Sequence, residues 1–298
     1  MGTQLQTQTE AKSFSIQIEQ TGSGSIAQVL HPTWIRRNNL FQMGQLLADI
    51  DKQISDKAPR IKLVLTAGGF IELWPNLNIE YKELTSEASL RKILDVVKKS
   101  MEPLLQIFAM ANIQRDYVVG VDAVVNDKGA GQFAVAIVKG KIETIAWKSF
   151  PVMDENEFIA GYRSALGIKS PRITATSLGK TLLLVCHDAQ AFNHRNQALV
   201  HKAHRKTQRS VVMQEMQDIV IREQPSVALD LVHYVGKRGS IKTFANSYKQ
   251  LSTDFACHPT VVGAFGYDKP VRKDLKDIAT RAQYPEGSAG CMIVVSII

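Results

Sequence analysis

Residues 179–195 read "GKTLLLVCHDAQAFNHR". Four apolar residues, Leu182 to Val185, lead directly into Cys186, and a polar sequence that is compatible with a helix follows. An apolar run of this length, bounded by a glycine and a polar segment, predicts a buried strand that ends at the cysteine. A strand that passes into a helix places its last residue at the carboxyl edge of the sheet, where open α/β sheets bind ligands.

Two roles suit Cys186 in this position. A lone cysteine behaves as a small buried core residue, and such a residue also packs well at the end of a strand. A cysteine at the sheet edge, near the N-terminus of a helix, is instead favoured as a thiolate, which is the nucleophilic form. The position at the edge makes Cys186 the candidate nucleophile of the chain.

The sequence around this stretch alternates between strands and helices. Lys139–Gly140 and Leu178–Gly179 have the composition of tight turns, so each predicts a hairpin between neighbouring strands. The expected strands are 13–20, 60–70, 117–125, 132–140, 141–150, 172–177, 180–186, 226–234, 259–267 and 290–298, and the expected helices are 38–54, 86–111 with a kink or break at Pro103, 189–223 as one or two helices, and 240–252. This pattern predicts an α/β protein with a mixed sheet.

Composition excludes several classes of protein. The chain has 298 residues, of which 45% are hydrophobic and 21% charged, as in ordinary globular proteins. No apolar run approaches the roughly 18 residues of a membrane span, and no secretory signal stands at the start, so we expect a cytoplasmic protein. The three cysteines are odd in number and contain no CxxC pair, which argues against disulfides and structural zinc. We expect a disordered lead-in at 1–12 and a single domain over 13–298.

Net charge is the main argument for a polyanionic partner. The chain carries a formal charge of +8 with a pI of about 9.3, and His194–Arg209 contains no acidic residue. This stretch has no aromatic residues on which bases stack, so we expect a solvated helix face and no nucleic-acid partner. Its histidines lack additional ligands of the kind a metal site needs, so no metal is expected.

Three segments together resemble the nitrilase superfamily of carbon–nitrogen hydrolases. They are the strand and turn "TLLLVCHDAQAF", the upstream hairpin "FAVAIVKGKIETIAWKSFP" and the stretch "DENEFIAGYR", in the order and spacing of that family over about residues 115–195. The resemblance implies a four-layer α-β-β-α sandwich, no cofactor, and a homodimer or larger homo-oligomer. It also implies hydrolysis of a small amide or nitrile, with an amide favoured, through an acyl-enzyme on cysteine.

The resemblance assigns roles to individual residues. Cys186 matches the nucleophile and Lys148 the lysine that stabilises the developing oxyanion, while His187 stands where an aromatic residue is usual and Asp188 keeps the following acid. Candidates for accessory or substrate-binding residues are Glu155, Glu157, His187, Asp188, Lys237 and Arg238, the last two in a loop that would border the site and contact an acidic substrate.

The glutamate of the family's triad has no direct counterpart. A gapless alignment places Gly68 there, and the nearest acid is Glu72 within "FIELWP". Either an insertion brings Glu72 inward as a tentative base, or the base is missing. An enzyme is favoured, and the alternatives are a nitrilase-fold binding or regulatory protein and, less favoured, a basic protein associated with nucleic acid.

Overall fold

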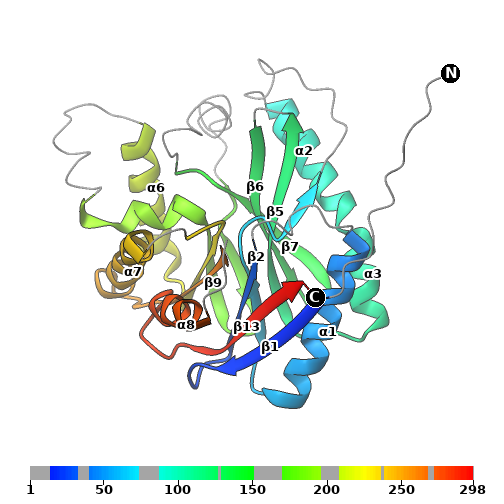
Figure 1. Cartoon of the computed structure of the whole chain (residues 1–298). Helices are drawn as coiled ribbons and strands as arrows, with labels where there is room; N and C mark the ends of the chain where they lie inside the picture. The colour runs from blue at the N-terminus through cyan, green and yellow to red at the C-terminus, as the bar shows by residue number, and fades with distance from the viewer. Residues whose placement is uncertain are drawn as a thin grey trace.

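The computed structural model describes residues 14–32, 40–73, 87–126, 129–150, 170–195, 208–235, 238–267 and 272–297. Two sheets lie face to face at its centre (Figure 1). The first contains β1 (Phe14–Gln20), β2 (Ile26–Pro32), β3 (Leu63–Thr66), β4 (Ile71–Leu73), β5 (Asp116–Asn126), β6 (Gly129–Val138), β7 (Lys141–Trp147) and β13 (Ala289–Ile297). The second contains β8 (Ile173–Thr176), β9 (Gly179–Val185), β10 (Val227–Val232), β11 (Thr260–Tyr267) and β12 (Gln283–Tyr284).

The sheets are continuous at one edge. Their strands follow the order β7-β6-β5-β3-β2-β11-β10-β9-β8, and the link is a short parallel pairing of His31 with Gly266 and Pro32 with Tyr267. The inner strands of both halves are parallel, whereas β6–β7 and β8–β9 are antiparallel hairpins. The expected mixed sheet is therefore confirmed. Because β9 and β10 run parallel, their carboxyl ends meet at the same edge.

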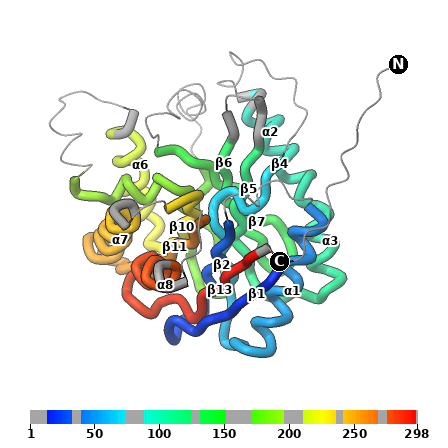
Figure 2. The backbone as a smooth tube through the Cα atoms, viewed as in Figure 1, coloured from blue at the N-terminus to red at the C-terminus, as the bar shows by residue number. Residues whose placement is uncertain are grey.

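Helices cover the outer face of each sheet, as Figure 1 and the backbone trace in Figure 2 show. The first sheet is covered by α1 (Leu40–Lys57), α2 (Glu87–Ser100) and α3 (Glu102–Met110), and the second by α6 (Gln208–Glu223), α7 (Arg238–Thr253) and α8 (Arg272–Arg281). The buried apolar residues form one cluster under each helix layer and a third between the sheets. These three clusters separate four layers, and the predicted α-β-β-α sandwich is confirmed.

Alternation along β9 shows how the sequence specifies these layers. Leu182 and Leu184 pack under the helices of the second sheet, whereas Leu183 and Val185 pack between the sheets. Side chains of a strand point to opposite faces in turn, so an uninterrupted apolar run is what a strand buried on both faces needs. On the facing sheet the inter-sheet layer contains Ala134, Ala136 and Ala146, whose small side chains allow a close approach.

The expected break at Pro103 is confirmed: Pro103 divides the long helical stretch into α2 and α3, as its missing N–H favours a helix start. Other local expectations differ from the structure. The helical stretch expected over 189–223 starts within the 3₁₀ helix η4 (Cys186–Phe192) and ends with α6, and residues 196–207 lie outside the described part of the chain. Strand β2 was not expected, because Gln28 and His31 interrupt its apolar pattern, although both are buried.

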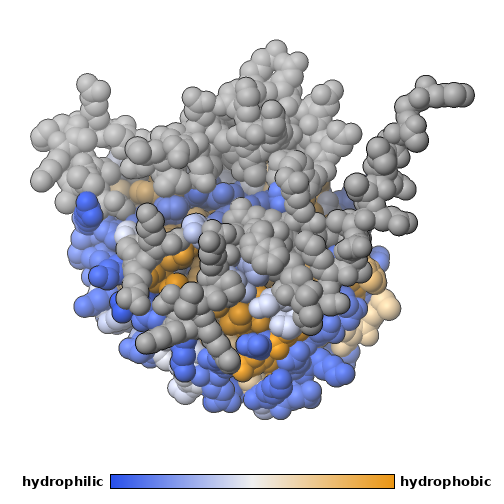
Figure 3. Space-filling view, viewed as in Figure 1, coloured by the Kyte–Doolittle hydropathy of each residue, from blue (hydrophilic) through white to orange (hydrophobic). Residues whose placement is uncertain are grey.

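The outer surface of the described chain is mainly polar around the rim, with apolar side chains showing towards the centre of the view in Figure 3. In the part of the chain that the structure covers, no helix combines the length and the apolar character needed to cross a membrane.

Candidate functional site

Cys186 occupies a sharp turn between β9 and η4. Its φ angle is +54°, in the left-handed region that non-glycine residues rarely adopt, and its side chain is buried with 5% of the residue exposed. The Sγ atom lies 3.2 Å from Nδ1 of His187, whose ring packs against Phe244 of α7. A strained backbone that persists in a folded protein often marks a functional position.

The surroundings of the thiol favour its ionised form. Burial by itself raises the pKa of Cys186, but hydrogen bonds with His187 and His233 and the charge of Lys148 outweigh burial and bring this pKa well below its usual value. Burial raises the pKa of the other two cysteines, in the case of Cys291 to about 11. Cys186 is therefore the cysteine with thiolate character.

Lys148 follows the last residue of β7 and is 2% exposed. Its backbone N–H donates to the carbonyl of Gln132 on β6, at 3.0 Å, which continues the β6–β7 pairing past the end of the strand. The ammonium lies near enough to Cys186 to lower the pKa of the thiol. The structure thus brings together Cys186 and Lys148, the two residues that the resemblance paired, and both are buried.

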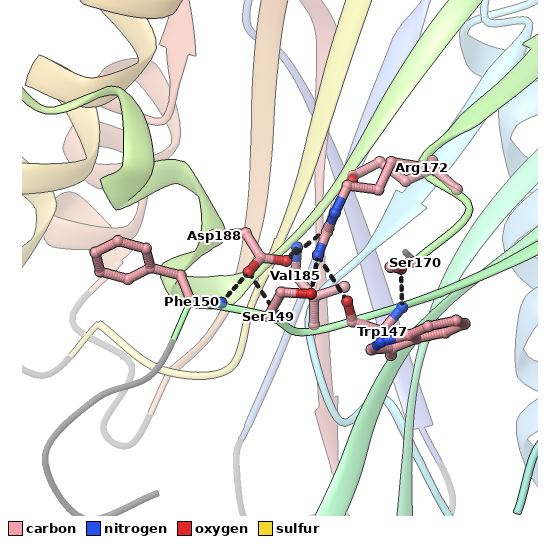
Figure 4. A network of polar contacts seen from close by, with 8 residues as sticks. Trp147, Ser149, Phe150, Ser170, Arg172, Val185 and Asp188 are labelled. Atoms are coloured by element: carbon pink, nitrogen blue, oxygen red, sulfur yellow. Dashed lines mark hydrogen bonds and ion pairs between the residues drawn. The ribbon is translucent and has the colours of Figure 1, made fainter. Parts of the chain in front are cut away.

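A buried ion pair joins the Lys148 segment to the Cys186 turn (Figure 4). One carboxylate oxygen of Asp188, Oδ1, accepts the backbone N–H groups of Ser149 at 2.9 Å and Phe150 at 2.7 Å. The other, Oδ2, accepts the N–H of Val185 at 3.1 Å and Nη1 of Arg172 at 2.8 Å. Asp188 is fully buried, so its carboxylate braces the turn rather than facing solvent.

Arg172 completes this brace. It lies just before β8, is buried, and its Nη2 donates to the carbonyl of Trp147 at 2.8 Å and to Oγ of Ser149 at 2.7 Å. The backbone N–H of Trp147 donates in turn to Ser170 at 2.9 Å. The residues on both sides of Lys148 are therefore held by hydrogen bonds that originate in the hairpin leading to the cysteine.

A buried histidine and aspartate complete the polar groups at this edge. His233 directly follows β10, and its Nε2 lies 2.7 Å from Oδ1 of Asp122 on β5 of the facing sheet. Burial lowers the pKa of His233, but the Asp122 carboxylate and the hydrogen bond to Cys186 raise it overall, to about 9. Cys186, His233 and Asp122 thus form a connected series of a thiol, an imidazole and a carboxylate.

Comparison with known proteins gives a structural match only. No protein-family model and no curated protein matches the sequence. The structure resembles that of a carbon–nitrogen hydrolase from Helicobacter pylori G27, at 12% identity and a TM-score of 0.51, over 80% of this chain and 73% of that one. The fold is that of a carbon–nitrogen hydrolase. An amidase from Nesterenkonia sp. is also similar, at 12% identity and a TM-score of 0.46, over 94% and 92% of the two chains.

Within this carbon–nitrogen hydrolase fold, the space that a side chain at position 68 would need is occupied by residues at the end of β10. A Cβ atom on Gly68 would lie 2.4 Å from Nδ1 of His233 and 2.8 Å from the carbonyl oxygen of Leu231. The backbone N–H of Gly68 donates to the carbonyl of Val232 at 3.2 Å, which fixes the β3 turn against β10. Gly68 is therefore a point of close contact between the sheets, where a side chain has no room.

Glu72 lies on β4, in register with Asp122 on β5, which is in turn opposite Gln132 on β6. Lateral neighbours in a sheet point to the same face. Glu72, Asp122, Gln132 and Lys148 therefore form a row across the inner face of the first sheet. Glu72 is half-buried there, and its lateral neighbour in the row is Asp122.

Several predicted site residues lie outside the described part of the chain. These are Glu155, Glu157 and Lys237, together with the side chain of Arg238, whose backbone begins α7. Of the basic stretch, His194 is exposed and pairs with Asp254. Among the described residues, no group of three His, Cys, Asp or Glu side chains has the arrangement of a metal site.

His233 and Asp122 were not among the sequence candidates. One signal was present for each: His233 ends an apolar strand parallel to the cysteine strand, and Asp122 interrupts the apolar run "YVVGVDAVV". An acid within a buried strand needs a buried partner, and that partner lies 111 positions away.

Proposed function

We propose that this protein is an enzyme that hydrolyses a non-peptide carbon–nitrogen bond, an amide in preference to a nitrile, through an acyl-enzyme on Cys186. The observation that carries the proposal is the environment of the Cys186 sulfur, a buried thiol with lowered pKa beside His187, His233 and Lys148. A cysteine that served only to fill the core would lie among apolar groups, where burial raises the pKa. The resemblance in the three sequence segments and the carbon–nitrogen hydrolase fold support the same reaction class.

In the proposed reaction, the Cys186 thiolate attacks the carbonyl carbon of the amide. The carbon–sulfur bond forms as the π electrons move to the carbonyl oxygen. Lys148 supplies a fixed positive charge for this oxyanion, an effect that is largest in a site from which water is excluded. Collapse of the intermediate breaks the carbon–nitrogen bond and releases the amine, and water then hydrolyses the thioester to a carboxylic acid.

The proposed function is tested by acyl transfer to hydroxylamine. The protein is incubated with hydroxylamine and a panel of small aliphatic, aromatic, acidic and neutral amides and nitriles, and hydroxamate formation is measured. We expect hydroxamate from at least one amide, an acyl adduct on Cys186 by peptide mass spectrometry, and loss of both in Cys186→Ala. Hydroxamate formation that survives in Cys186→Ala would contradict the proposal.

A second measurement does not depend on the choice of substrate. Iodoacetamide at pH 7 should label Cys186 faster than Cys257, although Cys257 is the more exposed of the two. Preferential labelling of Cys257 with an inert Cys186 would count against the nucleophile. A reactive Cys186 that transfers no acyl group from any of the panel would instead favour the binding or regulatory protein that Gly68, in the place of the family's glutamate, first suggested.

The same proposal extends to the organisation of the protein. We take residues 13–298 as one catalytic domain of a cytoplasmic protein, as the composition indicates, and propose that it acts as a homodimer or larger homo-oligomer, as the resemblance implies. Sedimentation equilibrium of the purified chain tests the oligomeric state.

A further inference from the structure

The ring of His233 and a side chain at position 68 exclude one another. A Cβ on Gly68 would come within 2.4 Å of Nδ1 and 2.6 Å of Cε1 of His233, distances at which two atoms overlap. Gly68 is the residue that the gapless alignment places at the glutamate of the family's triad. The space beside position 68 is therefore occupied by an imidazole that comes from the other sheet.

Two neighbouring glycines allow the turn at 67–69 to pack closely against β5 and the His233 ring. Gly120 on β5 lies so close to the β3 turn that a Cβ there would be 2.0 Å from the carbonyl oxygen of Ala67, and a Cβ on Gly69 would be 2.8 Å from Oδ2 of Asp122. The φ angle of Gly69 is +64°, which a residue with a side chain adopts only with strain. The turn at 67–69 is thus compressed between β5 and the His233 ring.

The orientation of the ring follows from Asp122. Nε2 of His233 lies 2.7 Å from Asp122 Oδ1, in a buried hydrogen bond that fixes the ring and leaves Nδ1 as the nitrogen that faces Gly68. His233 and Cys186 also lie close enough for each to shift the pKa of the other, and the pKa of His233 is raised to about 9 by Asp122 and the thiolate against the opposing effect of burial. The geometry is that of a nucleophile, a base and a group that orients the base.

We propose that His233, oriented by Asp122, is the proton-transfer residue for Cys186, and that it acts in place of an acid at position 68 or of Glu72. This inference rests on the proposed function and assigns the base within it. The resting pair is a thiolate and an imidazolium. His233 gives its proton to the departing amine as the carbon–nitrogen bond breaks, and the neutral imidazole then takes a proton from the attacking water. Release of the acid restores thiolate and imidazolium, so one amide and one water become one acid and one amine.

The test compares His233→Ala and Asp122→Asn with Glu72→Gln, and uses His194→Ala as the matched control because His194 also pairs with an aspartate, but on the surface. Turnover of the best amide of the panel is measured together with the pH dependence of Cys186 alkylation by iodoacetamide. General acid–base catalysis contributes about 10²- to 10⁴-fold, so we expect His233→Ala to lower turnover at least about 100-fold. We also expect its alkylation midpoint to rise by at least about one pH unit. His194→Ala should change neither quantity.

The assignment would be overturned if Glu72→Gln lost turnover while His233→Ala kept turnover within about threefold of the wild type and an unchanged alkylation midpoint. That result would leave the proposed function intact. Failure of Cys186→Ala to lower turnover would instead remove the proposed function itself. Circular dichroism establishes that each variant is folded, and Asp122→Asn keeps the assignment testable if His233→Ala does not fold, because it preserves the shape of the side chain.

A glutamate introduced at position 68, with and without His233, tests the inference independently. Gly68→Glu alone should lose turnover and stability, since its side chain meets the His233 ring. The double variant Gly68→Glu/His233→Ala removes that ring, and we expect it to fold better than Gly68→Glu and to exceed His233→Ala in turnover. A Gly68→Glu variant with wild-type stability and turnover would show that the two side chains do not compete for this space, and would overturn the inference.

Discussion

Arg172 and Asp188 form a buried ion pair in which Nη1 and Oδ2 are 2.8 Å apart. The pair joins the chain on either side of Lys148 to the turn of Cys186, because Asp188 accepts the backbone N–H groups of Ser149 and Phe150 as well as that of Val185. Two residues 38 positions apart in the sequence, Lys148 and Cys186, are in this way held in a fixed relation.

Asp188→Asn should therefore affect both stability and turnover. Removing one partner of a buried pair leaves Arg172 as an uncompensated charge, at a cost of roughly 3–5 kcal/mol in the free energy of unfolding. Asp277→Asn, which breaks the exposed pair with Arg281, should cost at most about 0.5 kcal/mol. Urea denaturation measures both. Equal losses of stability in the two variants would contradict the stabilising role of the buried pair. A kcat that falls in Asp188→Asn while KM stays constant, under conditions where the protein is folded, would show that Asp188 positions the catalytic residues.

The rate of the proposed reaction should follow a bell-shaped pH profile. The rising limb reports the Cys186 thiol, whose pKa lies well below its usual value, and the falling limb reports His233, whose pKa is about 9. The titratable groups that act on this pair are Asp122 on β5, Asp230 on β10 itself, Lys148 after β7 and His187 in η4. We expect a plateau at neutral pH and a decline near pH 9 in kcat/KM, and a profile that keeps rising above pH 9 would contradict the pair.

The same shift predicts a change of stability with pH. The folded state raises the pKa of His233 from 6.5 to about 9, so it binds this proton more tightly than the unfolded chain. The stabilisation is complete below about pH 6.5 and is lost as the pH rises through about 9. The free energy of unfolding of His233→Ala should therefore lie below that of the wild type by an amount that becomes smaller between pH 6.5 and 9. Denaturation at several pH values measures this difference, and a difference that stays constant would contradict the shift.

Asp230→Asn tests a second buried acid near the thiol. Asp230 is fully buried, Tyr248 donates to its Oδ2 at 2.8 Å, and within the described residues its Oδ1 has no hydrogen-bond partner. Burial, followed by the charge of Cys186, raises its pKa well above the usual value, so the folded protein keeps this proton to a higher pH than the unfolded chain, in which aspartate ionises near pH 4.

Folding must therefore take up a proton at Asp230, and this contribution weakens stability as the pH rises above about 4 until the folded pKa is reached. Asparagine is neutral throughout, so Asp230→Asn should gain stability relative to the wild type on going from pH 5 to pH 7.5. Urea denaturation at the two pH values, compared as a difference between variant and wild type, measures this. A difference that does not change with pH would contradict a neutral Asp230.

Gly120→Ala tests the compressed turn at the sheet interface. Its Cβ would meet the backbone oxygen of Ala67 at 2.0 Å, and backbone moves only at a cost, so we expect a loss of about 1–3 kcal/mol and lower turnover. Gly44→Ala is the comparison, because its Cβ meets only the flexible end of Ile107 at 2.5 Å and the helix gains from alanine. Thermal denaturation ranks the two. A Gly120→Ala variant as stable as Gly44→Ala would show that the turn has room.

The sequence by itself determined the elements that bring Cys186 and Lys148 to strand ends. An apolar run buried on both faces, hairpin turns at two glycines and a break at Pro103 are local features, and each acts within a few residues of itself. The resemblance in three segments then led from these elements to the four-layer fold. What it could not provide was the base, because position 68 holds a glycine.

The tertiary structure decided the identity of the groups around the thiol. His233 and Asp122 lie on different sheets, and Arg172 reaches Asp188 from another strand, so their partnerships depend on strand order and on the packing of the inter-sheet layer. A period of two along a strand specifies which face a side chain takes. It does not specify which distant strand lies opposite, because that choice is made by the summed burial of all the layers.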